Sequence, residues 1–260
     1  MAGPAKEKTV TVAGTALRYL EAGEGPAILL LHGADGAPWS PLHDMLSAHG
    51  RVIAPEHPGF GRSPIPDWMM GMGDLAYFYL DLLRALDLRD VHLLGHCVGG
   101  WIAAEVAIRS TGRIATLALL APAGVAAPEA PFDDIFVWSA DEFARRQFHD
   151  PALAETWRQQ QATLDVDIHL QNRTGLARLA WNPRLHDPQL PFWLHRINKP
   201  TLLVWGDDDR VAPLACHRAF LREIEGARLV TLPATGHALT VENADKVAAE
   251  LQAFFQGAKG

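Results

Sequence analysis

The chain has 260 residues, of which 48% are hydrophobic and 20% are charged, and its formal net charge is −7. This length allows one large domain with a substantial core, and the acidic balance without any run of Lys and Arg argues against a nucleic-acid or acidic-lipid surface. No apolar run approaches the roughly 20 residues of a membrane span, and the N-terminus lacks the apolar segment of a signal peptide, so we expect a cytoplasmic protein.

Apolar strand patterns and amphipathic helix patterns alternate along most of the chain. Residues 8–12 and 16–23 are expected to pair as antiparallel strands around a turn. Such alternation predicts an α/β fold with a mainly parallel, eight-stranded sheet and helices on both faces. The other expected strands are 27–33, 51–56, 91–95, 114–122, 200–206 and 227–233, and the expected helices are 74–86, 101–109, 215–224 and 244–255.

The alternation stops between Pro122 and about Asn198. Helix starts are expected at Ser139, which opens a capping-box pattern, and at Asp150, which precedes a proline. Four of the eight tryptophans and five of the ten phenylalanines fall in this region. We therefore expect a core formed by 1–124 and 197–260, a helical cap at 125–196, and an apolar pocket beneath the cap.

Neither a metal nor a cofactor is expected. The twelve histidines show no ligand spacing, and pairs such as His92 and His96 lack the cysteine or carboxylate cluster that a zinc site needs. The two cysteines, Cys97 and Cys216, are expected to stay unpaired in a reducing compartment. Cys216 lies in a helix pattern without a motif and is expected to be structural.

The segment LLGHCVGGW places one nucleophilic side chain, Cys97, between a strand and a helix. A nucleophile on such a turn needs a strained backbone, and small residues two positions away, here Gly95 and Gly99, let the strand and helix approach each other. The side chain then stands at the N-terminus of the helix, where free N–H groups favour an anion. The pattern therefore predicts a reactive thiolate at Cys97.

Two further groups follow Cys97 in suitable places. An acidic triplet, Asp207 to Asp209, comes directly after a strand, and His237 lies on a loop between a strand and a helix. The order nucleophile, acid, histidine is typical of this sheet architecture. Spacing alone does not choose among the three carboxylates.

The first buried strand ends in His32, Gly33 and Ala34, where a backbone N–H could hold a developing oxyanion together with the N–H of Val98. We expect His32 to form the loop rather than to act in catalysis. The roles of Asp35 and His57 stay open. Either residue could touch the substrate or tune the Cys97 thiolate, and turn formation is the alternative role for each.

These motifs resemble the α/β-hydrolase fold, and in particular enzymes of the esterase and C–C hydrolase type. The resemblance rests on LLLHGAD, PEHPGFGRSP, LLGHCVGGW, LLVWGDDDRVAP and ATGHALTVENADKV, which together cover nearly the full length except the cap. It implies Cys97 as the nucleophile, His237 as the general base, Asp209 as the acid, and Ala34 and Val98 as the oxyanion hole. Asp209 is selected because the acid of the family follows the strand-ending glycine by three residues.

The cysteine departs from the family pattern, because most relatives with a GHxxGG elbow carry serine. Dienelactone hydrolases are similar in having Cys with His and Asp, although the rest of this chain does not resemble them. Three explanations stay open for Cys97: a natural cysteine hydrolase, a serine enzyme engineered to cysteine, or an inert relative.

The expected reaction is hydrolysis of a carboxylic ester, thioester or lactone through an acyl-cysteine intermediate. The expected substrate is a small molecule with an apolar acyl or aromatic group. The alternatives are an acyltransferase, a hydrolase that cleaves a carbon–carbon bond in a diketone, and a non-catalytic receptor that uses the same pocket. The sequence does not decide the oligomeric state, a homo-oligomer included.

Overall fold

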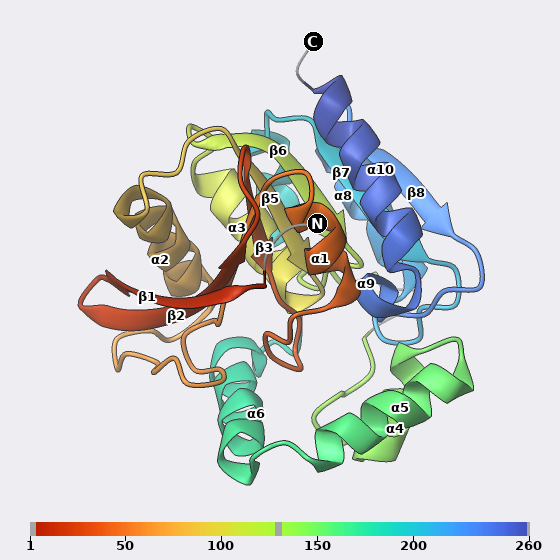
Figure 1. Cartoon of the computed structure of the whole chain (residues 1–260). Helices are drawn as coiled ribbons and strands as arrows, with labels where there is room; N and C mark the ends of the chain where they lie inside the picture. The colour runs from red at the N-terminus through yellow and green to blue at the C-terminus, as the bar shows by residue number, and fades with distance from the viewer. Residues whose placement is uncertain (1–3, 128–131, 259–260) are drawn as a thin grey trace.

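The structure is a computed structural model that describes residues 4–127 and 132–258 (Figure 1). Its centre is an eight-stranded sheet in the order β1-β2-β4-β3-β5-β6-β7-β8, which confirms the predicted fold class. The strands are β1 (Lys6–Val12), β2 (Thr15–Ala22), β3 (Ala27–Leu31), β4 (Arg51–Pro55), β5 (Val91–His96), β6 (Ile114–Leu120), β7 (Thr201–Gly206) and β8 (Arg228–Leu232).

The direction of the strands follows their sequences. β1 and β2 form the expected antiparallel hairpin, whose turn residues Ala13 and Gly14 have φ values of 47° and 78°. β2 also pairs antiparallel with β4, and from β4 to β8 every neighbouring pair is parallel. β5 and β7 are buried at every residue, as expected for parallel strands covered on both faces.

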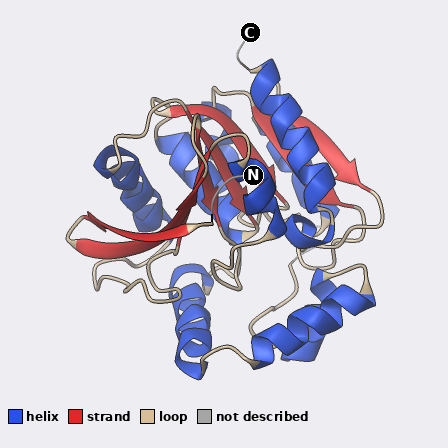
Figure 2. Cartoon of the chain, in the orientation of Figure 1, coloured by secondary structure: helices blue, strands red, loops and turns tan. Residues whose placement is uncertain are grey.

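Helices cover both faces of the sheet, and Figure 2 shows them flanking the strands. The core helices are α1 (Pro41–Ser47), α2 (Met72–Ala85), α3 (Val98–Arg109), α8 (His217–Glu223), α9 (Leu239–Glu242) and α10 (Ala244–Gly257), with short 3-10 turns at Leu194–Arg196 and Leu214–Cys216.

Alternate residues of a strand point to opposite faces of the sheet, and β3 shows this clearly. Leu29 and Leu31 join the apolar cluster beneath α2 and α3. Ile28 and Leu30 join the cluster beneath α1 and α10.

The cap contributes further helices, and Figure 1 shows α4, α5 and α6 beyond the sheet at the bottom of the view. Both predicted helix starts are confirmed: Ser139 Oγ accepts from the Glu142 N–H at 3.1 Å, and Asp150 Oδ1 accepts from the Ala152 N–H at 2.7 Å. The limits of the cap at residues 125 and 196 stay a prediction. The helices are α4 (Ala140–Gln147), α5 (Pro151–Ala162), α6 (Val166–Ala180) and α7 (Leu190–Trp193).

Within the described ranges, none of the helices combines the length and the apolar character needed to cross a bilayer.

Candidate active site

Cys97 lies between the end of β5 and the start of α3. Its φ of 52° and ψ of −117° are sparsely populated for a residue with a side chain, so the surrounding structure must hold it there. The Cys97 N–H donates to the Leu120 carbonyl at 3.0 Å, and its own carbonyl accepts from the N–H groups of Trp101 at 3.1 Å and Ala123 at 3.0 Å. These three bonds fix the strained turn, and the residue is only 3% exposed.

Two glycines allow this turn to form. A Cβ added at Gly99 would lie 2.1 Å from the Leu31 carbonyl oxygen at the end of β3. A Cβ added at Gly95 would lie 2.1 Å from the Gly99 carbonyl oxygen. Because real Cβ atoms do not approach backbone oxygens so closely, only glycine permits the observed packing of strand against helix at these positions.

His237 and Asp209 form a buried pair beside the elbow. His237 Nδ1 lies 2.8 Å from Asp209 Oδ2, and the two side chains are 3% and 0% exposed. The other oxygen, Oδ1, accepts from the N–H groups of Val211 at 2.9 Å and Ala212 at 2.8 Å. Both oxygens of the Asp209 carboxylate therefore have hydrogen-bond partners. The carboxylate orients the His237 imidazole so that Nε2 is directed away from Asp209.

The other two acids of the triplet have different partners. Asp207 Oδ1 accepts from the Thr235 N–H at 3.4 Å. Asp208 forms an ion pair with Arg210 at 2.7 Å, and its Oδ2 lies 2.8 Å from His149 Nδ1 near the surface. Of the three carboxylates, Asp209 is therefore the one that lies against His237.

The protonation of His237 follows from its neighbours. Burial lowers its pKa, but the negative charges of Asp209 and of a Cys97 thiolate outweigh burial and raise the pKa well above its ordinary value. Among the described residues, His237 Nε2 has no partner with full hydrogen-bond geometry. Cys97 is therefore near enough to affect the pKa of His237, but its thiol is not aligned for a hydrogen bond with Nε2. The arrangement therefore favours the protonated form of the His237 imidazole beside Cys97.

Ala34 and Val98 are the two residues expected to form the oxyanion hole. Val98 is the first residue of α3, and Ala34 lies in the segment 32–36 that follows β3, which we name the β3 loop. A Cβ added at Gly33 of this loop would be 3.4 Å from the Cys97 Cβ, which places the loop beside the elbow. Within the described chain, no hydrogen bond is recorded from the N–H of Ala34 or Val98, so both donors are free for a ligand.

Two cavities lie between the cap and the core, with volumes of about 160 Å³ and about 300 Å³. Asp35, Trp157 and Gln161 line both of them. Trp138 and Phe143 of the cap add aromatic surface to the smaller cavity. The predicted apolar pocket beneath the cap is therefore present.

Asp35 faces this pocket, whereas His57 does not. Although Asp35 keeps some contact with solvent, the surrounding protein desolvates its carboxyl and raises its pKa, against the smaller lowering effect of His237, Trp157 and Gln147. Sequence reasoning left a substrate contact open for Asp35, and its position in the pocket is compatible with one.

His57 is fully buried in a polar network that shapes the β3 loop. Its N–H donates to His32 Nε2 at 2.9 Å, its ring stacks on His32 with centroids 3.6 Å apart, and it also contacts the Tyr79 hydroxyl. His32 in turn contacts the Gly33 carbonyl at 2.7 Å. Burial lowers the pKa of His57 to about 4, so it stays neutral. The expectation that His32 forms the loop is confirmed, and His57 has the same kind of role.

Sequence reasoning missed two cap residues that line these cavities, Gln147 of α4 and Asn172 of α6, which carry no motif. Trp157 of α5 was one of the four cap tryptophans from which an apolar pocket was predicted. Gln147 is 2% exposed, and it lines the larger cavity together with Asp35. Its Nε2 is close enough to lower the pKa of the Asp35 carboxyl, but among the described residues it forms no hydrogen bond of full geometry. In the ranges 4–127 and 132–258, no group of three or more His, Cys, Asp or Glu side chains could hold a metal ion.

Comparisons with known proteins show the family to which the chain belongs. The dihydrolipoyllysine-residue acetyltransferase component of the acetoin cleaving system of Pseudomonas putida is 32% identical over 98% of this chain and 70% of its own length. The 2-hydroxy-6-oxo-6-phenylhexa-2,4-dienoate hydrolase of Comamonas testosteroni is 28% identical over 88% of this chain and 87% of its own. The crystal structure of a membrane phospholipase A superposes with a TM-score of 0.83 at 27% identity, over 98% of this chain and 87% of that one. The sequence pattern of the alpha/beta hydrolase family matches residues 28–250, so the chain belongs to that family.

Proposed function

We propose that the protein hydrolyses ester-type acyl bonds through a Cys97–His237–Asp209 triad. The observation that carries this proposal is the buried 2.8 Å pair of His237 and Asp209 beside a strained, strand-to-helix cysteine. Nucleophile, base and orienting acid in this relation are the arrangement that acyl transfer requires. An inert protein would have no need to hold all three groups together in its core.

In the proposed reaction, His237 takes the Cys97 proton and the thiolate attacks the substrate carbonyl carbon. A C–S bond forms, and the carbonyl electron pair moves to the oxygen, where the N–H groups of Ala34 and Val98 stabilise the charge. The intermediate collapses, the C–O bond breaks, and the leaving group receives the proton from His237. Water then gives a proton to His237, attacks the thioester and releases the acid, and the proton returns to Cys97. Asp209 orients the imidazole throughout and stabilises its positive charge.

The pocket supports a small acyl donor with an apolar or aromatic group. Its cavities are of the size that holds a small organic molecule, and Trp138, Phe143 and Trp157 supply aromatic walls. A thiolate converts an ester into a thioester, which is the less stable acyl form, so aryl esters, thioesters and lactones should react better than simple alkyl esters.

Hydrolysis of a carbon–carbon bond is the second candidate, and it is favoured by the similarity to the dienoate hydrolase of Comamonas testosteroni. Acyl transfer to another acceptor is favoured by the similarity to the acetyltransferase component of Pseudomonas putida. Each of these reactions can be distinguished from ester hydrolysis. Cleavage of a vinylogous diketone that is much faster than cleavage of esters indicates hydrolysis of a carbon–carbon bond. Formation of an acylated alcohol or thiol indicates acyl transfer.

The test is p-nitrophenol release from p-nitrophenyl butyrate, with the intact protein mass recorded on the same samples. Steady release that disappears in Cys97→Ala but persists in Cys216→Ala, the matched variant at the other buried cysteine, supports the proposal. Release at equal rates in the unaltered protein and in Cys97→Ala would remove Cys97 from the mechanism. A single burst that leaves a stable acyl mass on Cys97 would instead favour acyl transfer, to be followed by addition of an acceptor.

A further inference from the structure

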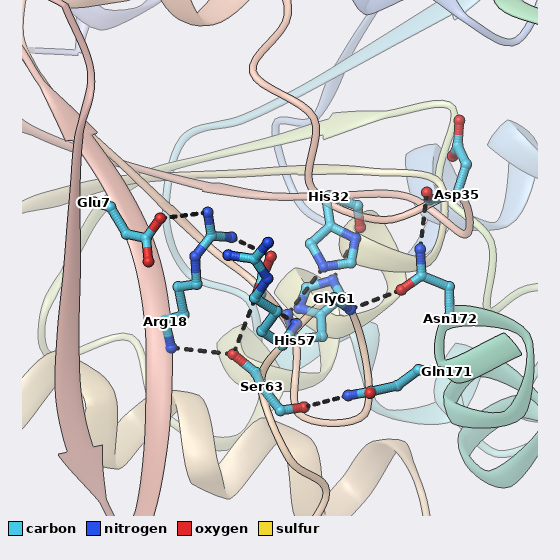
Figure 3. A network of polar contacts seen from close by, with 11 residues as sticks. Glu7, Arg18, His32, Asp35, His57, Gly61, Ser63, Gln171 and Asn172 are labelled. Atoms are coloured by element: carbon cyan, nitrogen blue, oxygen red, sulfur yellow. Dashed lines mark hydrogen bonds and ion pairs between the residues drawn. The ribbon is translucent and has the colours of Figure 1, made fainter. Parts of the chain in front are cut away.

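One residue of the cap connects two loops of the core beside the elbow (Figure 3). The side chain of Asn172, on α6, lies between the β3 loop and the segment 56–71 after β4, which we name the β4 loop. Its Oδ1 accepts from the Gly61 N–H at 2.7 Å, and its Nδ2 donates to the Asp35 carbonyl at 3.4 Å. Asn172 is 8% exposed, so these contacts are made away from bulk water.

The packing around Asn172 limits how far the β3 loop can move. At Gly36, where φ is +100°, an added Cβ would lie 2.7 Å from Asn172 Nδ2, so the amide rests directly on the loop backbone. One helical turn further along α6, a Cβ added at Gly175 would lie 2.2 Å from the Gly59 carbonyl oxygen. This backbone contact fixes the position of α6, and therefore the position of Asn172, against the core.

The first half of the β3 loop is held by His32, which contacts the Gly33 carbonyl at 2.7 Å and accepts from the His57 N–H at 2.9 Å. The second half has a weaker internal hold, because the hydrogen bond from the Gly36 N–H to the Gly33 carbonyl is 3.5 Å long, at the limit of such a bond. Ala34, whose N–H is proposed to bind the oxyanion, lies inside this turn. A donor must keep its position to within about half an ångström to stabilise the charge that develops in the transition state, so an external hold on this loop has a direct chemical consequence.

We propose that Asn172 is a positioning residue that couples the cap to the oxyanion hole. By holding Gly61 firmly and limiting the movement of the Asp35 carbonyl, its amide keeps the Ala34 N–H directed at the site where the oxyanion forms. Asn172 acts through the β3 loop and need not touch the substrate. This inference rests on the proposed function, because it assumes that an acyl carbonyl is attacked by Cys97.

A suitable control lies next to Asn172 on the same helix. Gln171 Nε2 donates to the Ser63 carbonyl at 3.1 Å and so ties α6 to the β4 loop without touching the β3 loop. Gln171→Ala therefore removes one hydrogen bond between cap and core but leaves the hydrogen bond from Asn172 Nδ2 to the Asp35 carbonyl intact. Asn172→Ala removes both bonds, whereas Asn172→Asp keeps an acceptor for Gly61 and places a negative oxygen against the Asp35 carbonyl.

The experiment compares two reactions of Cys97 in each variant. Alkylation by iodoacetamide needs the thiolate but forms no oxyanion, whereas acylation by p-nitrophenyl butyrate needs both. Loss of one oxyanion donor costs about 100- to 1000-fold in rate, and misplacement should cost less, so we expect acylation to fall roughly 10- to 100-fold in both Asn172 variants. Alkylation should change less than about twofold, and Gln171→Ala should leave the ratio of the two rates unchanged.

Three results would overturn the inference: an equal fall in both reactions, an unchanged ratio in the Asn172 variants, or the same change in Gln171→Ala. If Asn172→Ala does not fold, as judged by its thermal unfolding, Asn172→Asp decides. An unaltered protein that is alkylated but never acylated would refute the proposed function, and this inference with it. Normal acylation of the unaltered protein, with no effect of the Asn172 variants, would refute this inference alone.

Discussion

Replacement of Asp209 by asparagine should abolish most of the activity while leaving the fold intact. Oδ1 accepts from two backbone N–H groups, and leaving them unpaired would cost about 1–3 kcal/mol each, so the asparagine oxygen should stay there. Its NH₂ group then faces His237 Nδ1, which must become an acceptor. The proton moves to Nε2, and the imidazole can no longer take a proton from Cys97.

The expected size of the loss follows from that tautomer. The corresponding change in serine triads lowers the rate by about 10⁴, and a loss of roughly 10³ to 10⁴ in kcat/KM here equals about 4–5.5 kcal/mol of transition-state stabilisation. The assay is the initial rate of p-nitrophenyl butyrate hydrolysis, with the tautomer of His237 read from ¹⁵N NMR. Asp208→Asn is the matched control, because the contacts of Asp208 with Arg210 and His149 near the surface should contribute at most about 1 kcal/mol to stability and nothing to the tautomer of His237. Retention of more than a tenth of the rate in Asp209→Asn, or an equal loss in Asp208→Asn, would refute the reasoning.

Further predictions concern the charges and packing around the site. In Cys97→Ala, His237 loses one of the two anions that raise its pKa, so its NMR titration should move to lower pH, and an unchanged titration would contradict the ion pair. Gly175→Ala places a methyl group 2.2 Å from a backbone oxygen and should lower the free energy of unfolding by about 1–3 kcal/mol in urea, whereas Gly112→Ala, whose nearest atom is 3.9 Å away, should not. Because burial raises the pKa of Asp35, its charge destabilises the fold above that pKa but not below the unfolded value of about 3.9. Asp35→Asn should therefore raise the melting temperature at pH 8 and leave it nearly unchanged at pH 3. An equal rise in melting temperature at both pH values would contradict the destabilisation by a buried Asp35 charge.

Much of the core could be predicted because its signals are local. β3, β5, β6 and β7 are short apolar runs that read as buried strands, and the helices between them have regular apolar spacing. The elements that were not predicted have weaker signals. α1 is only seven residues long, and α6 contains Thr174 and Gly175, which lower helix propensity. Tertiary packing of Gly175 against the β4 loop explains why glycine stands inside that helix.

The elbow was accessible from the sequence for the same reason, since its glycines and Cys97 lie within five residues. Asp209 was chosen among three carboxylates only through the family resemblance, and the structure places it against His237. Asn172 and Gln147 were not accessible, because their contacts with the β3 loop depend on how the cap helices pack across more than a hundred residues of sequence. No short pattern marks a side chain whose partner is a distant backbone carbonyl.

The histidines around Cys97 are divided by their surroundings into one that can carry a proton and others that cannot. His96 lies beside His237, with ring centroids 4.8 Å apart, and contacts the His237 carbonyl at 2.9 Å. Burial, together with the positive charge of His237, lowers the pKa of His96 to about 3, and burial lowers that of His57 to about 4. His237 is equally buried, but Asp209 and Cys97 supply negative charge there and reverse the sign of the shift. A proton that leaves the Cys97 thiol therefore has one favourable acceptor among these rings, and Asp209 determines which ring that is.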